Sequence, residues 1–377
     1  YGFKHLDKET DMKILDRILS AIGLENIVEK LSSKDLTWGD LHTLLLHIFE
    51  NRIHDISPTE IMRNYKENRF STVAEADPRE LLEIDRILYG ILPAHFSVVE
   101  LSPVNPVGVN STLTSLDPKI VLLTIRNLEV IGDPSMALSI ECARRRESLR
   151  TTKKDTETHL ATSHRVLRLQ DFPKSSGFTA HFRAFAMASA ARDIAGFNKF
   201  ELSSITDHIE TWLNFLIGWS NLGYKVQNTS VAISDIRIME KLISGGKVNK
   251  DEVIRRTKDK KFKPYKEYSI NLPEEAEKAQ DIPVAYPELE THINELRFTE
   301  QKIIEPLRTK YPNVRFYFSL DRCSGLGYYS GICYRVSAEN AGGRNHSLAG
   351  GGACDWTRKL MNNKREHLVT SGFGTEF

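Results

Sequence analysis

The segment from Cys323 to Trp356 is rich in glycine although its other residues favour β-strands. It reads CSGLGYYSGICYRVSAENAGGRNHSLAGGGACDW and contains a glycine triplet at 350–352. Glycine has no Cβ atom, so it either adopts positive φ in turns or lets a ligand approach a strand backbone closely. Two interpretations therefore fit the pattern, a β-hairpin with a loose loop and a binding site lined by backbone.

Other residues suited to chemistry give weaker patterns. His181 is a candidate acid–base residue, although an isolated histidine more often packs in a core. Neither G-x-x-x-x-G-K-[ST] nor a strand-linked G-x-G-x-x-G occurs, which excludes the common phosphate-binding loops. The spacing of the four cysteines matches neither paired zinc ligands nor a C-x-x-C redox pair, and we expect no metal site.

Composition narrows the class of protein further. The chain has 377 residues, 40% of them hydrophobic and 27% charged, with a net charge of +1. Such a balance argues against a dedicated nucleic-acid or anionic-membrane binder, although two basic runs, ARRRESLR and RRTKDKKFKPYK, are compatible with an RNA contact. No apolar run reaches the length of a membrane span and no signal-peptide pattern opens the chain, so we expect a cytoplasmic protein with no membrane contact.

The hydrophobic pattern predicts two regions. Residues 1–75 predict a helical module, with Thr37 and Ser57 as helix caps. Residues 76–377 predict strands in clusters with helices between the clusters, which favours an α+β fold with an antiparallel sheet over a doubly wound one. Segment 120–132 predicts a pair of strands. Segment 327–336 predicts another strand, which would place Tyr328 and Tyr329 on opposite faces. Residues 245–285 predict an insertion of mixed basic and acidic character.

Taken in order, these segments resemble the catalytic domain of class II aminoacyl-tRNA synthetases, most closely the histidyl-tRNA synthetase branch. The family sequences R-G-L-D-Y-Y-T-G and A-G-G-G-R-Y-D match SGLGYYSG at 324–331 and AGGGACD at 349–355. Weaker matches are EVIGDPSMAL, LRLQDFPKSSGFTAHF at motif 2 and TSGFGTEF at motif 3. The resemblance covers roughly residues 80–377 and includes no anticodon-binding domain. It implies a class II synthetase-like sheet flanked by helices, and a homodimer.

The resemblance also implies a chemistry, in which an amino-acid carboxylate attacks the α-phosphate of ATP and fixed positive charges stabilise the transition state. Arg168 matches the motif 2 arginine that contacts the α-phosphate. With Gln170, Phe182 and Gly372 it forms the implied site for ATP with magnesium. The implied amino-acid site consists of one acid, one hydroxyl residue, two tyrosines and three glycines: Asp133, Ser135, Tyr328, Tyr329, Gly350, Gly351 and Gly352.

Several charged positions of the family are changed in this chain. Ser324 replaces the arginine before G-L-D-Y-Y, Gly327 replaces the aspartate within that motif, and Gln170 replaces the motif 2 glutamate. Losing one charged donor, such as the arginine that Ser324 replaces, costs about 3 kcal/mol or more at the transition state, which disfavours adenylate formation at normal rates. Arg183, Arg322 and Arg335 are candidates to replace part of the lost charge.

The sequence therefore leaves three functions open. The first is a divergent histidyl-tRNA synthetase-like protein that binds an amino acid-like or nucleotide ligand in a regulatory or accessory role, as in the regulatory subunit of ATP phosphoribosyltransferase. The second is ATP-dependent activation of an amino acid other than histidine. The third is a pseudo-synthetase domain that supports RNA binding or protein assembly.

Overall fold

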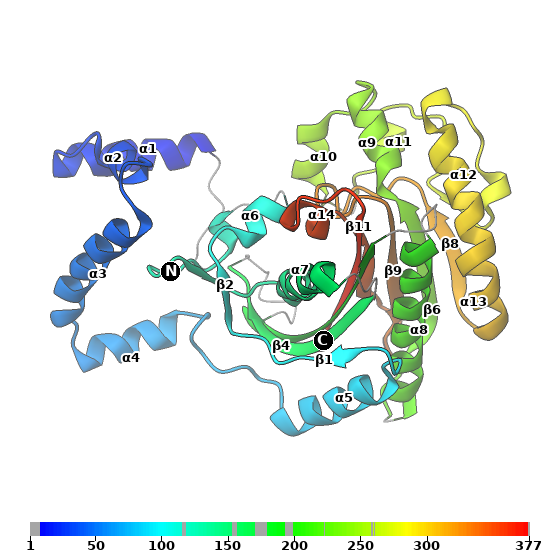
Figure 1. The fold of residues 1–377 in the computed structure, drawn as a ribbon, viewed down its shortest axis with the longest axis horizontal. Coiled ribbons are helices and arrows are strands. Elements are labelled where there is room, and N and C mark those ends of the chain that lie inside the picture. Colours follow the sequence, from blue (N-terminus) through cyan, green and yellow to red (C-terminus); the bar gives the residue numbers. More distant parts are fainter. Residues whose placement is uncertain are drawn as a thin grey trace.

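Nine strand-forming segments between residues 97 and 374 assemble into one curved sheet (Figure 1). The structure is a computed structural model that describes residues 8–114, 118–152, 157–169, 179–192, 199–221, 223–257, 259 and 261–375. Along the sheet the strands are β1 (Ser97–Val98), β4 (Thr158–Leu167), β5 (His181–Arg192), β11 (Glu366–Gly374), β10 (Asn345–Cys354), β9 (Ile332–Glu339), β6 (Gln227–Asp235), β8 (Arg315–Ser319) and β7 (Glu275–Ala276).

Most neighbouring strands of this sheet are antiparallel. Only the pairs β1–β4 and β6–β8 run parallel within the described residues. A separate antiparallel pair joins β2 (Val104–Pro106) to β3 (Leu128–Val130). The α+β class with a mostly antiparallel sheet flanked by helices, predicted from the sequence, is confirmed.

Each face of the sheet carries its own hydrophobic core because strand residues alternate between faces. On β5, Phe185 and Met187 pack in the core that includes α8 (Lys199–Asn221). The intervening Ala186 and Ala188 pack in a second core with α7 (Pro134–Thr152) and α14 (Trp356–Leu360). Figure 1 shows α7 within the concave side of the sheet and α8 outside it. The alanines leave room for α7 to lie close to the strands.

The remaining elements surround this framework. The helices are α1 (Lys8–Ile22), α2 (Ile27–Ser32), α3 (Trp38–His54), α4 (Pro58–Glu67), α5 (Pro78–Ile91), α6 (Val109–Leu113), α9 (Ile236–Ser244), α10 (Lys250–Arg256), α11 (Pro264–Glu267), α12 (Glu290–Thr299) and α13 (Glu305–Lys310). Short 3-10 turns span Pro118–Ile120, Ala279–Asp281 and Pro287–Leu289, and a π-helical turn, Glu300–Ile304, links α12 to α13. No helix in the described ranges has the length and apolar character needed to cross a bilayer.

The first four helices extend away from the sheet (Figure 1). Thr37 accepts a hydrogen bond from the backbone of Asp40, and Ser57 accepts one from the backbone of Glu60, as the capping patterns predicted. None of the residues of α2, α3 or α4 is buried. These helices therefore contribute nothing to the two cores of the sheet.

Two sequence-based expectations about local structure are wrong. Residues 120–132 were expected to form two strands, but they form only β3 and a single bridge between Leu123 and Glu129. Asn127 between them has a φ of 57°, which interrupts an extended run. The strand expected over 327–336 starts later than predicted, because residues 324–328 form a turn and β9 begins only at Ile332.

The segment 245–285 contributes to the main core. Val253, Phe262 and Tyr265 are buried there. Its basic residues are largely compensated, since Arg256 pairs with Glu267 and Lys263 pairs with Glu274. This compensation weakens the case for an RNA contact through the second basic run.

A buried histidine makes the stability of the core depend on pH. His208 of α8 is fully buried between the hydroxyls of Ser189 and Ser371, at 3.0 Å from each. Burial, followed by the charges of His159 and His95, lowers the pKa of His208 to about 3. Below about pH 6.5 the unfolded chain binds a proton at this histidine, whereas the folded chain does not. The free energy of unfolding therefore decreases as the pH falls.

We expect the free energy of unfolding to fall by about 1.4 kcal/mol for each pH unit below about 6.5 on account of this one residue. Urea unfolding of the wild type and of His208→Gln at pH 7 and pH 5 measures the slope. The variant should show a smaller slope than the wild type, whereas His54→Gln, at an exposed site, should not. Equal slopes in all three proteins would contradict the assignment.

Candidate functional site

A cavity of about 220 Å³ lies on the α7 side of the sheet. Its wall combines the start of α7, the end of β4, the first half of β5, the turn before β9, and strands β10 and β11. The lining residues are Asp133, Pro134, Ser135, Arg168, Phe182, Ala184, Phe185, Tyr328, Tyr329, Gly350, Thr370, Ser371, Gly372, Phe373 and Gly374. Segments more than 200 residues apart in sequence therefore meet in one site.

Most residues named from the sequence lie on this wall. The structure brings together Asp133, Ser135, Arg168, Phe182, Tyr328, Tyr329, Gly350 and Gly372. Gly351 and Gly352 do not line the cavity, and Gln170 lies outside the described residues. Sequence reasoning missed Thr370, Ser371 and Phe373, although their strand lies in the segment matched to motif 3.

The three consecutive glycines differ in how much space their neighbours leave for a Cβ atom. A Cβ atom on Gly351 would lie 2.6 Å from Cβ of Ser371, and one on Gly352 would lie 2.5 Å from Cβ of Cys333. A Cβ atom on Gly350 would have its nearest neighbour at 3.6 Å, an ordinary contact. Strand packing thus accounts for the second and third glycines, and only the first forms part of the cavity floor.

Both tyrosines of the turn before β9 line the cavity, which corrects the expectation that a strand would separate them. Gly325 and Gly327 have φ values of 99° and 72°, which favour glycine and fold the chain back on itself. The rings of Tyr328 and Tyr329 meet edge to face, with centroids 4.8 Å apart. Burial, followed by the nearby charge of Asp133, raises the pKa of Tyr328, so this phenol stays protonated at neutral pH.

Asp133 begins the first turn of α7. One carboxylate oxygen accepts the backbone N–H of Ser135 at 2.9 Å, and the other accepts the hydroxyl of Tyr328 at 2.8 Å. These hydrogen bonds orient the carboxylate, but they do not neutralise its charge. Among the described residues no cationic side chain forms an ion pair with Asp133. The cavity thus contains an oriented negative charge.

Arg168 supplies a positive charge to the same cavity. Its Nε donates to the carbonyl oxygen of Gly132 at 2.7 Å, and its guanidinium carbon lies 5.2 Å from the ring centroid of Phe182. No carboxylate in the described ranges pairs with it. The remaining donors of this guanidinium are therefore available to an anionic group.

Two other candidates near the cavity are engaged elsewhere. Arg183, one of the arginines considered as a replacement for the lost charge, forms an ion pair with Asp85 of α5. His181 contacts the carbonyl oxygen of Thr72 at 2.6 Å and a guanidinium nitrogen of Arg165 at 2.8 Å. Both ring nitrogens of this histidine have partners, which fits a structural role.

A larger cavity of about 470 Å³ lies between residues 99–106 and α7. Its charged side chains include Glu141 and Arg145, which pair with each other at 2.7 Å. We favour the smaller cavity as the functional site because its carboxylate and its guanidinium have no such partners among the residues that the structure describes.

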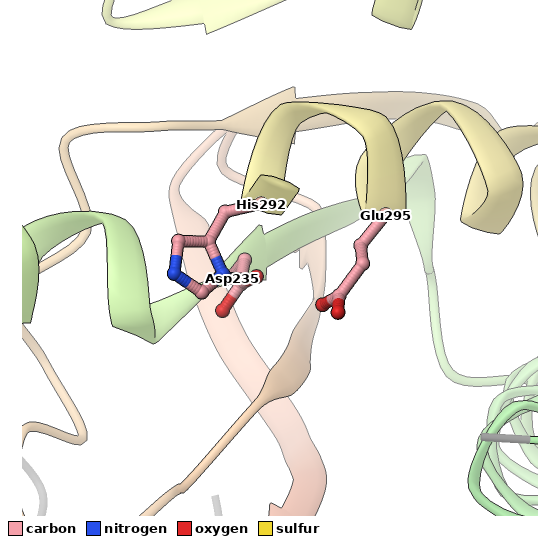
Figure 2. Close-up of side chains that lie close together, drawn as sticks. All are labelled: Asp235, His292 and Glu295. Atoms are coloured by element: carbon pink, nitrogen blue, oxygen red, sulfur yellow. Dashed lines mark ion pairs between the residues drawn. The ribbon is translucent and has the colours of Figure 1, made fainter. Parts of the chain in front are cut away.

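One group of metal-ligand types occurs among the described residues, and none of its members lines the cavity. Figure 2 shows Asp235 at the end of β6 facing His292 and Glu295 of α12. The guanidinium of Arg237 donates to Asp235 at 2.7 Å and also to Glu295. Although burial acts in the opposite direction, the neighbouring His292 and the guanidinium of Arg237 lower the pKa of Asp235. The arginine already supplies the positive charge, so this cluster fits an ion pair that joins α9 to α12.

Comparison with known proteins gives matches in structure only. No family model matches the sequence, and no curated protein is similar to it in sequence. An ATP phosphoribosyltransferase regulatory subunit/histidyl-tRNA synthetase from Bacillus halodurans superposes with a TM-score of 0.58 at 14% identity, covering 81% of this chain and 80% of the other. Histidyl-tRNA synthetase from Nostoc sp. gives 0.55 at 14% identity, with 81% and 72% covered.

A histidine–tRNA ligase subunit from Alicyclobacillus acidocaldarius also gives a TM-score of 0.55, at 12% identity, covering 81% of this chain and 94% of the other. Identities this low establish the fold and leave activity open. The chain has the class II aminoacyl-tRNA synthetase-like fold of histidyl-tRNA synthetase and of the ATP phosphoribosyltransferase regulatory subunit, as the glycine and tyrosine motifs predicted.

Proposed function

We propose that this protein binds an amino acid-like molecule in the 220 Å³ cavity and acts as a ligand-responsive accessory or regulatory protein. The observation that carries the proposal is the presence of Asp133 and Arg168 on one wall, each without an ion-pair partner among the described side chains. A zwitterion supplies both missing charges, with its ammonium group at Asp133 and its carboxylate at Arg168. The protonated hydroxyl of Tyr328 keeps the carboxylate of Asp133 directed towards the ammonium group.

The size of the cavity supports a small ligand. Its volume lies below the range of about 300–1,000 Å³ that is typical of sites for drug-sized molecules. A free amino acid fits this volume better than a nucleotide and an amino acid together. The described wall therefore favours binding over a two-substrate reaction.

Magnesium-bound ATP fits the described residues poorly. Asp133 is the only carboxylate on the described wall and already accepts two hydrogen bonds, whereas Mg²⁺ sites commonly use one or two carboxylates with water and phosphate oxygens. Arg183 is committed to Asp85, so Arg168 is the only guanidinium on that wall. Adenylate formation stays the second candidate function. It requires amino acid-dependent ATP–pyrophosphate exchange that Arg168→Ala abolishes.

Asp133→Asn tests the proposed function. Asparagine caps helices as well as aspartate does, so the fold should be retained while the charge is lost. Thermal shifts with each standard amino acid should identify at least one that stabilises the wild type by mass action. Calorimetry should then show binding of that amino acid about 10–100-fold weaker in the variant, as expected for a lost charged hydrogen bond.

Asp281→Asn is the matched control, because Asp281 is exposed and does not line the cavity. This control should bind like the wild type. Either of two results would reject the proposal: no amino acid stabilises the wild type, or the two variants bind equally well.

Three further expectations follow from the resemblance. A homodimer, a cytoplasmic location and an RNA or protein partner are each compatible with this fold. The regulatory-subunit relative supports an accessory role within an assembly.

A further inference from the structure

Two arginines converge beside the cavity at the residue where the resembling family has a single arginine. Arg335 of β9 donates from Nη2 to the hydroxyl of Ser324 at 2.6 Å. Arg322 donates from Nε to the backbone carbonyl oxygen of Ser324 at 2.9 Å. The guanidinium carbon of Arg322 also lies 5.5 Å from the ring centroid of Tyr329, which lines the cavity. The two guanidiniums thus share Ser324 and adjoin one wall of the site.

The register of the sheet places Arg335 next to the cavity floor. It lies opposite Gly350 on β10 and opposite Ala232 on β6. Opposed residues of antiparallel strands point to the same face, and neighbouring strands are about 4.8 Å apart. Gly350 is part of the cavity wall, and neither neighbour has a side chain long enough to cover a guanidinium. Arg335 therefore lies one strand away from Gly350 on the cavity wall, although it is not itself one of the lining residues.

Neither arginine has a counter-ion in the described part of the chain. The ion pairs of that part include carboxylate partners for Arg146, Arg183 and Arg237, but none for Arg322 or Arg335. Nη1 of Arg322 is buried and makes no hydrogen bond to any group in the described ranges. The adjacent carboxylate of Asp321 faces Ser319 and Lys263 instead.

This arrangement is costly without a ligand. Burial, and then the nearby charge of Arg322, lower the pKa of Arg335. Like charges held together in a partly buried place destabilise the folded protein. A charge in such a place without a counter-ion costs more free energy than a charge exposed to water. Costs of this kind persist where they serve binding.

We propose that Arg322 and Arg335 form an anion-binding site that takes the phosphate or carboxylate oxygens of a ligand on the Tyr329–Gly350 side of the cavity. Two guanidiniums present planar sets of donors to such oxygens, and Nη1 of Arg322 gains the partner that it lacks. The inference rests on the proposed function for its choice of cavity and narrows the ligand. An ammonium group at Asp133 and anions at both Arg168 and this pair describe an amino acid-like molecule with a second anionic group.

The pair can be tested without knowing the natural ligand. Inorganic phosphate and succinate serve as probes, with chloride at the same ionic strength as the reference, and thermal shift and calorimetry measure binding to the full chain. We expect phosphate or succinate to bind the wild type, and Arg335→Gln and Arg322→Gln each to weaken that binding at least about 10-fold. Preference for phosphate would indicate a phosphorylated ligand, and preference for succinate an acidic amino acid.

Arg344→Gln is the matched control, since Arg344 is exposed and the change in net charge is the same. Equal binding by Arg335→Gln and Arg344→Gln, or no binding of either probe by the wild type, would overturn the assignment. Ligand-free Arg335→Gln should be at least as stable as Arg344→Gln, because one of two like charges is removed. A lower melting temperature would instead identify Arg335 as a structural residue and also overturn it.

Asp133→Asn separates this inference from the proposed function. It should retain phosphate or succinate binding while losing the amino acid. Amino acids that bind the wild type while the arginine variants leave both probes unaffected would reject the anion site alone. Probe binding that depends on the two arginines, with no amino acid bound, would reject the zwitterion site alone.

Discussion

Gly352→Ala should destabilise the protein by about 3 kcal/mol and lower its yield of folded material. The added Cβ atom would lie 2.5 Å from Cβ of Cys333 and 2.7 Å from the carbonyl oxygen of Ile332, both on the neighbouring strand. Cys333 is fully buried at the centre of the sheet, so the strands cannot separate without loss of packing. Urea unfolding followed by circular dichroism measures the change.

Gly350→Ala is the control within the same triplet. Its Cβ atom meets only ordinary contacts and its φ is not positive, so alanine should leave stability unchanged or raise it by a few tenths of a kcal/mol. The new methyl group would instead narrow the cavity floor and weaken amino-acid binding. Equal losses of unfolding free energy in Gly352→Ala and Gly350→Ala would contradict the assignment of Gly352 to strand packing and of Gly350 to the cavity floor.

Arg146→Met should cost about 3–5 kcal/mol, because it leaves the carboxylate of Glu366 buried without its main partner. Arg146 of α7 is 4% exposed and Glu366 at the start of β11 is 0% exposed, and the two form an ion pair. Arg192 lies 3.4 Å from the same carboxylate but is only a weak substitute at that distance. Chemical unfolding at pH 7 measures the loss.

The double variant Arg146→Met/Glu366→Leu gives the control. An apolar pair of similar size removes the buried charge as well as its partner, and such replacements are often neutral or stabilising. We therefore expect it to be more stable than Arg146→Met alone. A double variant that is less stable than the single one would contradict this expectation, and it would show that Arg192 and Asn363 are sufficient partners for the carboxylate of Glu366 once the arginine is removed.

The sequence alone indicated much of the cavity. Local motifs carry the information for Asp133, Arg168 and the two tyrosines, because these residues sit in short segments that keep their order and spacing. Thr37 and Ser57 likewise marked the starts of two helices.

Other properties depend on contacts between distant segments and could not be predicted. Two of the three consecutive glycines serve packing because of where Cys333 and Ser371 lie on neighbouring strands. That Arg335 has no counter-ion among the described residues likewise depends on where every carboxylate of those segments folds. The turn at Tyr328, in contrast, could have been predicted. Gly325 and Gly327 both have positive φ, as glycines in turns often do, but the neighbouring strand-forming residues favoured the prediction of a strand.

The order in which the chain is made limits when the cavity can bind anything. The hydrogen bond between Tyr328 and Asp133 closes a loop of 195 residues, and Gly372 lies on the last strand, which inserts between β5 and β10. Closing such long loops is entropically expensive and slow, and a nascent chain on the ribosome holds only part of the wall. The ligand therefore cannot act as a template for early folding. It can bind and stabilise only a chain whose synthesis is complete through that strand.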